Sequence, residues 1–253
     1  MASRYRLLPF GVVWLSIAAC GNRDRIPDRE SAGAGAADDA GAAGAAGSTE
    51  IPAACVIVGA QGQPPLIDDF EDGDPALPQT SNRHGFWYAN NDGTGDQFPN
   101  ADPSGASFTL DAPGSTESPR YALHTTGSGF TSWGAFVSAY LSVQTNLLCP
   151  YDASTFSGIR FNVKGSGAVR VAIGTAATTP RAYGGRCEVD PCSDYGLVVT
   201  PGADWAEMRV AFDAVQLPSW ASVVPWKPDE VMRVSFWVEN GDFDFWLDDL
   251  AFF

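Results

Sequence analysis

The segment GIRFNVKGSGAVRVAIG, residues 158–174, contains two runs in which apolar residues alternate with other residues. The apolar positions are Ile159, Phe161, Val163, Val169, Val171 and Ile173. A period of two is typical of β-strands that bury one face. Gly165 and Gly167 separate the runs with a single serine between them, which indicates a tight turn. The segment therefore predicts two consecutive strands joined as a β-hairpin.

The same alternation recurs along most of the chain. Further candidate strands lie at 107–111, 121–125, 135–141, 206–213, 231–238 and 243–253. Proline and glycine punctuate the intervals, and helix signals are nearly absent after residue 50. Many short strands with turn-rich spacers predict an all-β fold, an antiparallel β-sandwich or jelly roll.

The start of the chain has the features of an export signal. Two arginines precede an apolar run at 7–19, which is shorter than the roughly 20 residues that span a bilayer. The run ends in Ile-Ala-Ala-Cys, residues 17–20, which resembles the lipobox of bacterial lipoproteins. That resemblance implies a lipoprotein signal peptide at 1–19 and lipidation of Cys20. The alternative is an ordinary signal peptide that is cut after Ala19.

The remaining chain divides by composition. Residues 20–50 are rich in glycine and alanine and lack aromatic residues, so they predict a disordered linker behind the lipidated cysteine. Residues 51–253 are long enough for one domain. We therefore expect an exported protein that is lipid-anchored to a bacterial membrane. The outer membrane is favoured, because Gly21 replaces the aspartate that is associated in some bacteria with inner-membrane retention.

The formal net charge of −15, from 15 Lys+Arg and 30 Asp+Glu, limits the possible partners. A surface this acidic repels phosphate backbones, which argues against nucleic acid as a partner. It suits divalent cations or neutral ligands.

Five cysteines fit an exported protein. With Cys20 lipidated, four remain, and an even number predicts two disulfides. Cys187 and Cys192 are close enough to close a small loop, which leaves Cys55 to pair with Cys149. A zinc site is disfavoured because neither histidine lies beside a cysteine.

Three motifs occur in the order and spacing of a known family. They are LIDDFEDGD at 66–74, YDASTFSGIRFNVKGSGAVRVAI at 151–173 and FDFWLDDLAFF at 243–253. This arrangement resembles family 11 carbohydrate-binding modules and related galactose-binding-like jelly rolls. The resemblance implies two β-sheets, non-catalytic glycan binding and often a structural calcium ion. The segment GGRCEVDPCSDYG at 184–196 is not part of the basic family pattern, so the identity of the ligand is not implied.

Carboxylates near both ends of the predicted domain are candidate calcium ligands. Asp69, Glu71 and Asp72 lie in the opening motif, and Asp248 lies in the closing strand. Terminal strands of a jelly roll are commonly neighbours, and Ca²⁺ prefers oxygen ligands, so these residues predict a structural Ca²⁺ site. The alternative is that Asp69 and Asp72 are solvated or cap a turn and that Asp248 is hydrogen-bonded to the backbone.

Aromatic residues on polar stretches are candidates for sugar binding, because sugar rings stack on aromatic faces. Trp237 has the same strand parity as two polar residues, and Trp133, Trp87 and Tyr88 lie among glycines and polar residues. Arg160 and Arg170 have the outer parity of the predicted hairpin and could bind hydroxyl groups. The alternative for each aromatic residue is packing in the core or at a sheet edge.

No catalytic motif is evident. The sequence lacks a nucleophile elbow, a zinc-protease motif and a P-loop, and two histidines leave little for a triad. We therefore predict a non-catalytic domain that binds a polysaccharide or oligosaccharide on a lipid-anchored bacterial protein. One alternative is a structural or protein-interaction module of the cell envelope with the same fold. Another is a glycoside hydrolase or lyase, which would need two carboxylates across a cleft.

Overall fold

The computed structural model describes residues 51, 55–59, 62, 64–79, 83–100, 110–111, 113–115, 120–144, 147–188 and 191–253. The predicted signal peptide, the lipidated Cys20 and the linker lie outside these residues. Within them, helical structure is limited to two short 3-10 turns, Arg181–Tyr183 and Pro228–Glu230. No helix in this part of the chain is long and apolar enough to cross a membrane.

The strands form two large sheets and one small hairpin. The first sheet contains β1 (Val58–Gly59), β3 (Phe86–Asn91), β7 (Ala135–Tyr140), β10 (Tyr151–Asp152), β12 (Val169–Thr175), β13 (Tyr195–Val199) and β15 (Val231–Val238). The second sheet contains β2 (Leu66–Asp68), β4 (Asp96–Phe98), β5 (Leu110–Asp111), β6 (Ala122–Ser128), β11 (Gly158–Ser166), β14 (Ala206–Ala211) and β16 (Phe243–Phe252). The small hairpin consists of β8 (Val143–Gln144) and β9 (Leu147–Leu148).

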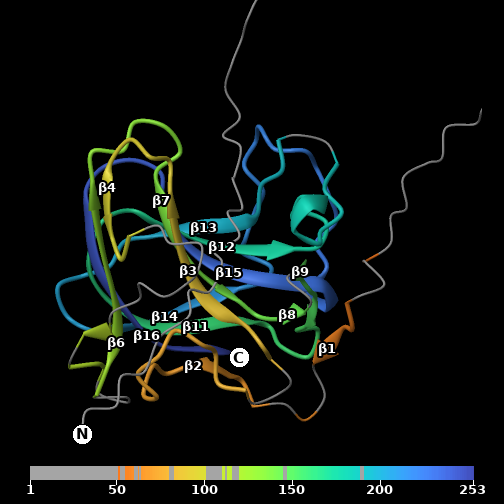
Figure 1. The fold of residues 1–253 in the computed structure, drawn as a ribbon, viewed down its shortest axis with the longest axis horizontal. Helices are drawn as coiled ribbons and strands as arrows, with labels where there is room; N and C mark the ends of the chain where they lie inside the picture. Colours follow the sequence, from red (N-terminus) through yellow and green to blue (C-terminus); the bar gives the residue numbers. More distant parts are fainter. Residues whose placement is uncertain are drawn as a thin grey trace, which may run out of the picture. The chain divides into compact units, whose positions relative to one another are not determined.

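The two sheets pack face to face and enclose the core. Across the first sheet the main order is β3–β7–β15–β12–β13, and across the second it is β14–β11–β16–β6–β4. Figure 1 shows β12, β13 and β15 together in one layer, with β11, β14 and β16 together in the other. Phe161 of β11 contacts Phe236 of β15 across the core, with ring centroids 4.9 Å apart. The predicted all-β sandwich is therefore confirmed.

The hairpin predicted for residues 158–174 is wrong. β11 pairs with β14 and β16 in the second sheet, whereas β12 pairs with β13 and β15 in the first. The chain passes from one sheet to the other through Gly165 and Gly167, at φ values of 124° and 117°. The apolar sets of β11 and β12 therefore face each other across the core. A period of two identifies a buried face, but it does not identify the sheet to which a strand belongs.

Both predicted disulfides are present. Cys55 is bonded to Cys149, and Cys187 is bonded to Cys192. The first joins residues 94 positions apart and ties the start of the described domain to the segment before β10. The second closes a short loop immediately before β13.

Candidate functional site

The outer face of the first sheet is built from the residues that alternate with its core positions. Strand pairing arranges these residues in three rows that run across the strands. The first row is Phe86, Tyr140, Arg233 and Gly174; the middle row is Tyr88, Ser138, Ser235, Ala172 and Gly196; the third row is Asn90, Phe136, Trp237, Arg170 and Val198. We call this surface the outer face.

Three aromatic side chains gather at the third row and form what we call the aromatic cluster: Trp133, Phe136 and Trp237. Ring centroids lie 5.9 Å apart for Trp133 and Phe136, 5.2 Å for Phe136 and Trp237, and 5.6 Å for the two tryptophans. The indole N–H of Trp237 donates to the carbonyl oxygen of Trp133 at 2.7 Å. Trp133 is 38% exposed and the other two rings are half-buried, so the cluster offers apolar surface to solvent.

A carboxylate fixes the loop that carries Trp133. Oδ2 of Asp92 accepts hydrogen bonds from the backbone N–H groups of Ser132 and Gly134, both at 2.9 Å. Its Oδ1 accepts from the backbone N–H and the hydroxyl of Thr94, at 2.9 and 2.6 Å. Although desolvation alone would raise the pKa of Asp92, these hydrogen bonds lower it to about 2. Asp92 therefore clamps the residues on both sides of Trp133.

A second aromatic group lies at the β3 edge of the outer face. Tyr88 stacks on Tyr140 with ring centroids 5.6 Å apart, and Phe86 contacts Tyr140 edge-on at 5.7 Å. Burial raises the pKa of Tyr140 to about 12, so its hydroxyl stays protonated at neutral pH.

The middle row between these aromatic groups consists of small side chains. The hydroxyl of Ser138 donates to that of Ser235 at 2.7 Å, and Ala172 and Gly196 continue the row. Gly196 also exchanges two backbone hydrogen bonds with Gln216, which extends the row beyond β13. These small residues are buried beneath the larger side chains of the neighbouring rows. The middle row therefore forms the floor of the outer face, and the exposed surface belongs to the side chains around it.

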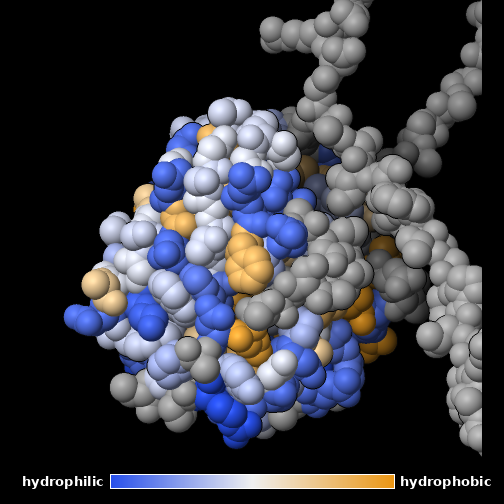
Figure 2. All heavy atoms as spheres, turned by 60° about the vertical axis from the view of Figure 1, so that its left-hand side comes forward, coloured by the Kyte–Doolittle hydropathy of each residue, from blue (hydrophilic) through white to orange (hydrophobic). Residues whose placement is uncertain are grey.

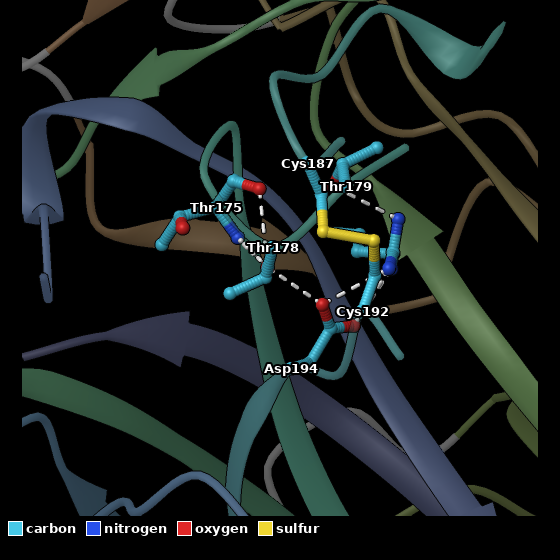
Figure 3. The surroundings of a disulfide bond; sticks show 7 residues. Thr175, Thr178, Thr179, Cys187, Cys192 and Asp194 are labelled. Atoms are coloured by element: carbon cyan, nitrogen blue, oxygen red, sulfur yellow. Dashed lines mark hydrogen bonds and ion pairs between the residues drawn. A yellow bond between two sulfur atoms is a disulfide. The ribbon is translucent and has the colours of Figure 1, made fainter. Parts of the chain in front are cut away.

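A buried ion pair occupies the β12–β13 end of the first row. Arg233 donates from Nε and Nη2 to the two carboxylate oxygens of Asp194, at 2.9 and 3.0 Å. The hydroxyl of Thr178 donates to the same carboxylate at 2.7 Å. Burial alone would lower the pKa of Arg233, but the charge of Asp194 holds it above its ordinary value. Figure 3 shows Asp194 and Thr178 beside the disulfide of Cys187 and Cys192. Cys192 precedes Asp194 by two residues.

Among the residues predicted to bind ligand, Trp237, Trp133, Tyr88 and Arg170 lie on or beside the outer face. Arg160 does not join them, because β11 belongs to the second sheet and its outward residues point to the opposite side of the sandwich. There Arg160 pairs with Glu207 at 3.4 Å. The prediction that both arginines share one face is therefore wrong.

The structure also corrects the prediction for Trp87. Its side chain is fully buried, contacts Phe70 and Phe236, and donates from the indole N–H to Asp68 at 2.8 Å. Adjacent residues of a strand face opposite sides, so Trp87 and Tyr88 cannot both reach one ligand. Tyr88 faces outward and Trp87 belongs to the core.

The four predicted calcium ligands do not converge. Asp69 and Asp72 accept hydrogen bonds from the backbone N–H groups two residues ahead, both at 3.3 Å. Glu71 binds the backbone and side chain of Arg120, and Asp248 accepts from the backbone N–H of Ser115 at 2.6 Å. No group of three or more His, Cys, Asp or Glu side chains within the described ranges could hold a metal ion. The arrangement therefore does not fit the predicted site and matches the capping alternative.

The outer face of the second sheet differs because its polar groups are largely paired with one another. His124 lies between the carboxylates of Asp111 and Asp244, at 2.5 and 2.8 Å, and stacks on Trp246. Lys164 lies 4.8 and 5.0 Å from the rings of Trp205 and Trp246. His124 and Lys164 are therefore already engaged by neighbouring side chains of this face.

Sequence reasoning missed several residues of the outer face. Phe136, Ser138 and Tyr140 could have been found, because they have the opposite parity to the core residues of the 135–141 run. Asp92 and Asp194 lie outside strands, where no periodicity marks them. The partners of Asp194 lie 16 and 39 residues away, so no local signal indicated this ion pair.

No family model and no curated protein matches the chain. Its structure is similar to the family 11 carbohydrate-binding module of the cellulosomal cellulase Lic26A-Cel5E of Clostridium thermocellum. The identity is 13% and the TM-score 0.45, over 78% of this chain and 95% of the module. It is also similar to a family 11 module from Clostridium thermocellum in complex with a beta-1,3-1,4-mixed-linked tetrasaccharide. Here the identity is 12% and the TM-score 0.45, over 75% of this chain and 95% of the module. For a family 30 carbohydrate-binding module the identity is 13% and the TM-score 0.44, over 66% of this chain and 92% of the module. These are similarities of fold at low sequence identity.

Proposed function

We propose that this protein binds a carbohydrate chain on the outer face without cleaving it. The observation that carries the proposal is the aromatic cluster, whose rings are partly exposed beside a strip of small side chains. Partly exposed indoles provide the apolar surface on which sugar rings stack, and Asn90 and Arg170 provide polar groups for hydroxyls.

Binding without cleavage is supported by the state of two carboxylates that border the outer face, Asp92 and Asp194. A glycosidase needs two carboxyl groups about 5–10 Å apart that are free to act on the substrate. Asp92 and Asp194, which border the outer face, each accept several hydrogen bonds from protein groups. Both are therefore committed to holding loops and side chains in place.

The test is a glycan array followed by calorimetric titration of the best ligand. Trp237→Ala should weaken binding at least tenfold, because the central, half-buried ring of the cluster is removed and Trp133 loses the side chain it packs against. Trp205→Ala, a tryptophan that contacts Lys164 on the second sheet, is the matched control and should bind like the parent. If the folded protein binds no glycan, or if both variants bind equally well, the proposal is wrong.

A second candidate is a protein-interaction role in the cell envelope. It is favoured by Trp220 and Val223, which are 60% and 93% exposed on a loop near β13. Figure 2 shows the side of the domain that lies on the left in Figure 1. Its described residues are largely hydrophilic, with hydrophobic residues at several places among them. Loss of a protein partner in Trp220→Ala, with glycan binding absent throughout, would select this role.

We also propose that Cys20 anchors the protein to the outer membrane. The support is the sequence of residues 1–20, with its basic start, short apolar run and lipobox-like end. Metabolic labelling with a radioactive fatty acid should mark the parent and not Cys20→Ser. Recovery of unlabelled parent from the soluble fraction would refute the anchor.

A further inference from the structure

Arg170 occupies an unusual position on the outer face. It lies in the third row, directly across from Trp237 of the neighbouring strand. Its guanidinium lies over Gly196, where an added Cβ would be 3.1 Å from Cζ of Arg170. One nitrogen, Nη2, donates to the backbone carbonyl of Asp194 at 2.6 Å. Because Gly196 has no side chain, the guanidinium can lie close to the sheet. The hydrogen bond to the carbonyl oxygen of Asp194 holds it there.

The positive charge of Arg170 has no carboxylate partner at ion-pair distance among the described residues. The nearby carboxylate of Asp194 already binds Arg233 and Thr178, and it offers Arg170 only its backbone oxygen. Burial lowers the pKa of Arg170, although the charges of Asp194 and Glu239 oppose this effect. Within the described residues the guanidinium has one hydrogen bond, to the carbonyl oxygen of Asp194, and no ion pair, so an anion beside Trp237 could accept hydrogen bonds from its other N–H groups.

We infer that the glycan bound by the outer face is a largely neutral chain with isolated anionic groups, and that Arg170 binds one such group beside Trp237. This inference rests on the proposed function. Arginine suits a carboxylate or a sulfate ester, because its planar fork can donate two parallel hydrogen bonds to either. The net charge of −15 would repel a densely charged polyanion, so sparse substitution fits the protein best.

The test uses matched glycans that differ only in charge. One arm compares glucuronoxylan with the same polymer after its carboxyl groups are reduced to alcohols. The other arm compares a sparsely sulfated galactan with its desulfated form. We expect the protein to bind one of the charged forms about tenfold more tightly than its neutral counterpart, as expected for hydrogen bonds to a charged group. The arm that shows the preference identifies the anionic group.

Two variants locate the effect. Arg170→Gln should bring the affinity ratio of the charged and neutral forms close to one. Arg160→Gln, on the opposite sheet, should keep the parental ratio. Equal or tighter binding of the neutral forms would overturn the inference and leave glycan binding intact. If the folded protein binds neither form nor any other glycan, the proposed function fails, and the inference fails with it.

Discussion

At the scale of single residues, neighbours in sequence have different roles because strand geometry separates them. Trp87 packs in the core and Tyr88 lies on the opposite side of the sheet, where its ring is buried against its neighbours, although the two residues are adjacent. Arg160 and Arg170 have the same outward parity but lie on opposite sides of the sandwich. The outer face thus depends on which strand a residue occupies as much as on its chemical type.

Asp92 gives the sharpest prediction at this scale. Asp92→Asn should lower glycan affinity several-fold, because one amide oxygen cannot replace a carboxylate that accepts four hydrogen bonds around Trp133. Asp96→Asn, an exposed neighbour on β4, is the control. Titration calorimetry measures the affinity, and tryptophan fluorescence reports the environment of the ring. Parental affinity in Asp92→Asn would show that the clamp does not position Trp133.

At the scale of elements, the sequence predicted strands well and their pairing poorly. The alternation at 158–174, 206–213, 231–238 and 243–253 marked β11, β12, β14, β15 and β16, because the apolar side chains at alternate positions pack in the core or against it. Sheet membership depends on partners far away in the chain, such as β11 with β16, and no local pattern encodes it. Most of the aromatic part of the site was visible in the sequence, whereas the Asp92 clamp and the Asp194–Arg233 pair depend on loops and distant partners.

The two disulfides should contribute unequally to stability. A disulfide restricts the unfolded chain more when it closes a longer loop, so replacing Cys55 and Cys149 with serine should cost about 4–5 kcal/mol. Replacing Cys187 and Cys192 should cost about 2 kcal/mol. Urea unfolding of both double variants tests this order.

The short loop should matter more for binding than for stability. The Cys187–Cys192 bond holds the segment that leads into Asp194, and through it Arg233 and Arg170. We expect the double serine variant of this pair to lose affinity for the glycan, measured by calorimetry at a temperature where it is fully folded. Greater loss of affinity in the Cys55 and Cys149 variant would contradict this assignment.

At the scale of the whole molecule, two buried carboxyl groups make stability depend on pH. Burial raises the pKa of Asp68 and of Asp248 to about 7 from 3.8, although hydrogen bonds from backbone N–H groups oppose this effect. Between these values the folded state holds protons that the unfolded state has released. The free energy of unfolding therefore falls as pH rises from about 4 to 7, and it levels off above that range.

The corresponding experiment is urea unfolding at pH 5 and pH 8. The free energy of unfolding of the parent should be lower at pH 8 than at pH 5 by a few kcal/mol. For each carboxyl group that is protonated only in the folded state, this free energy falls by about 1.4 kcal/mol per pH unit. Asp68→Asn should show a smaller difference between the two pH values, whatever its absolute stability, because the side chain no longer ionises. Asp213→Asn, at an exposed position, is the matched control. An unchanged difference in Asp68→Asn would show that Asp68 is already ionised at pH 5.

The disulfide between Cys55 and Cys149 has a mechanical consequence. Tension applied from the N-terminal side enters the domain at Cys55 and passes through the covalent bond to Cys149. Residues 56–148 lie within the closed loop, so a pull cannot peel their strands from the sheets while the bond is intact. The force reaches β10 and then β15, the strand that carries Trp237. Under the proposed anchor and the proposed glycan binding, the drag of a bound polymer would therefore pass to β10 and β15 without loading the strands inside the loop.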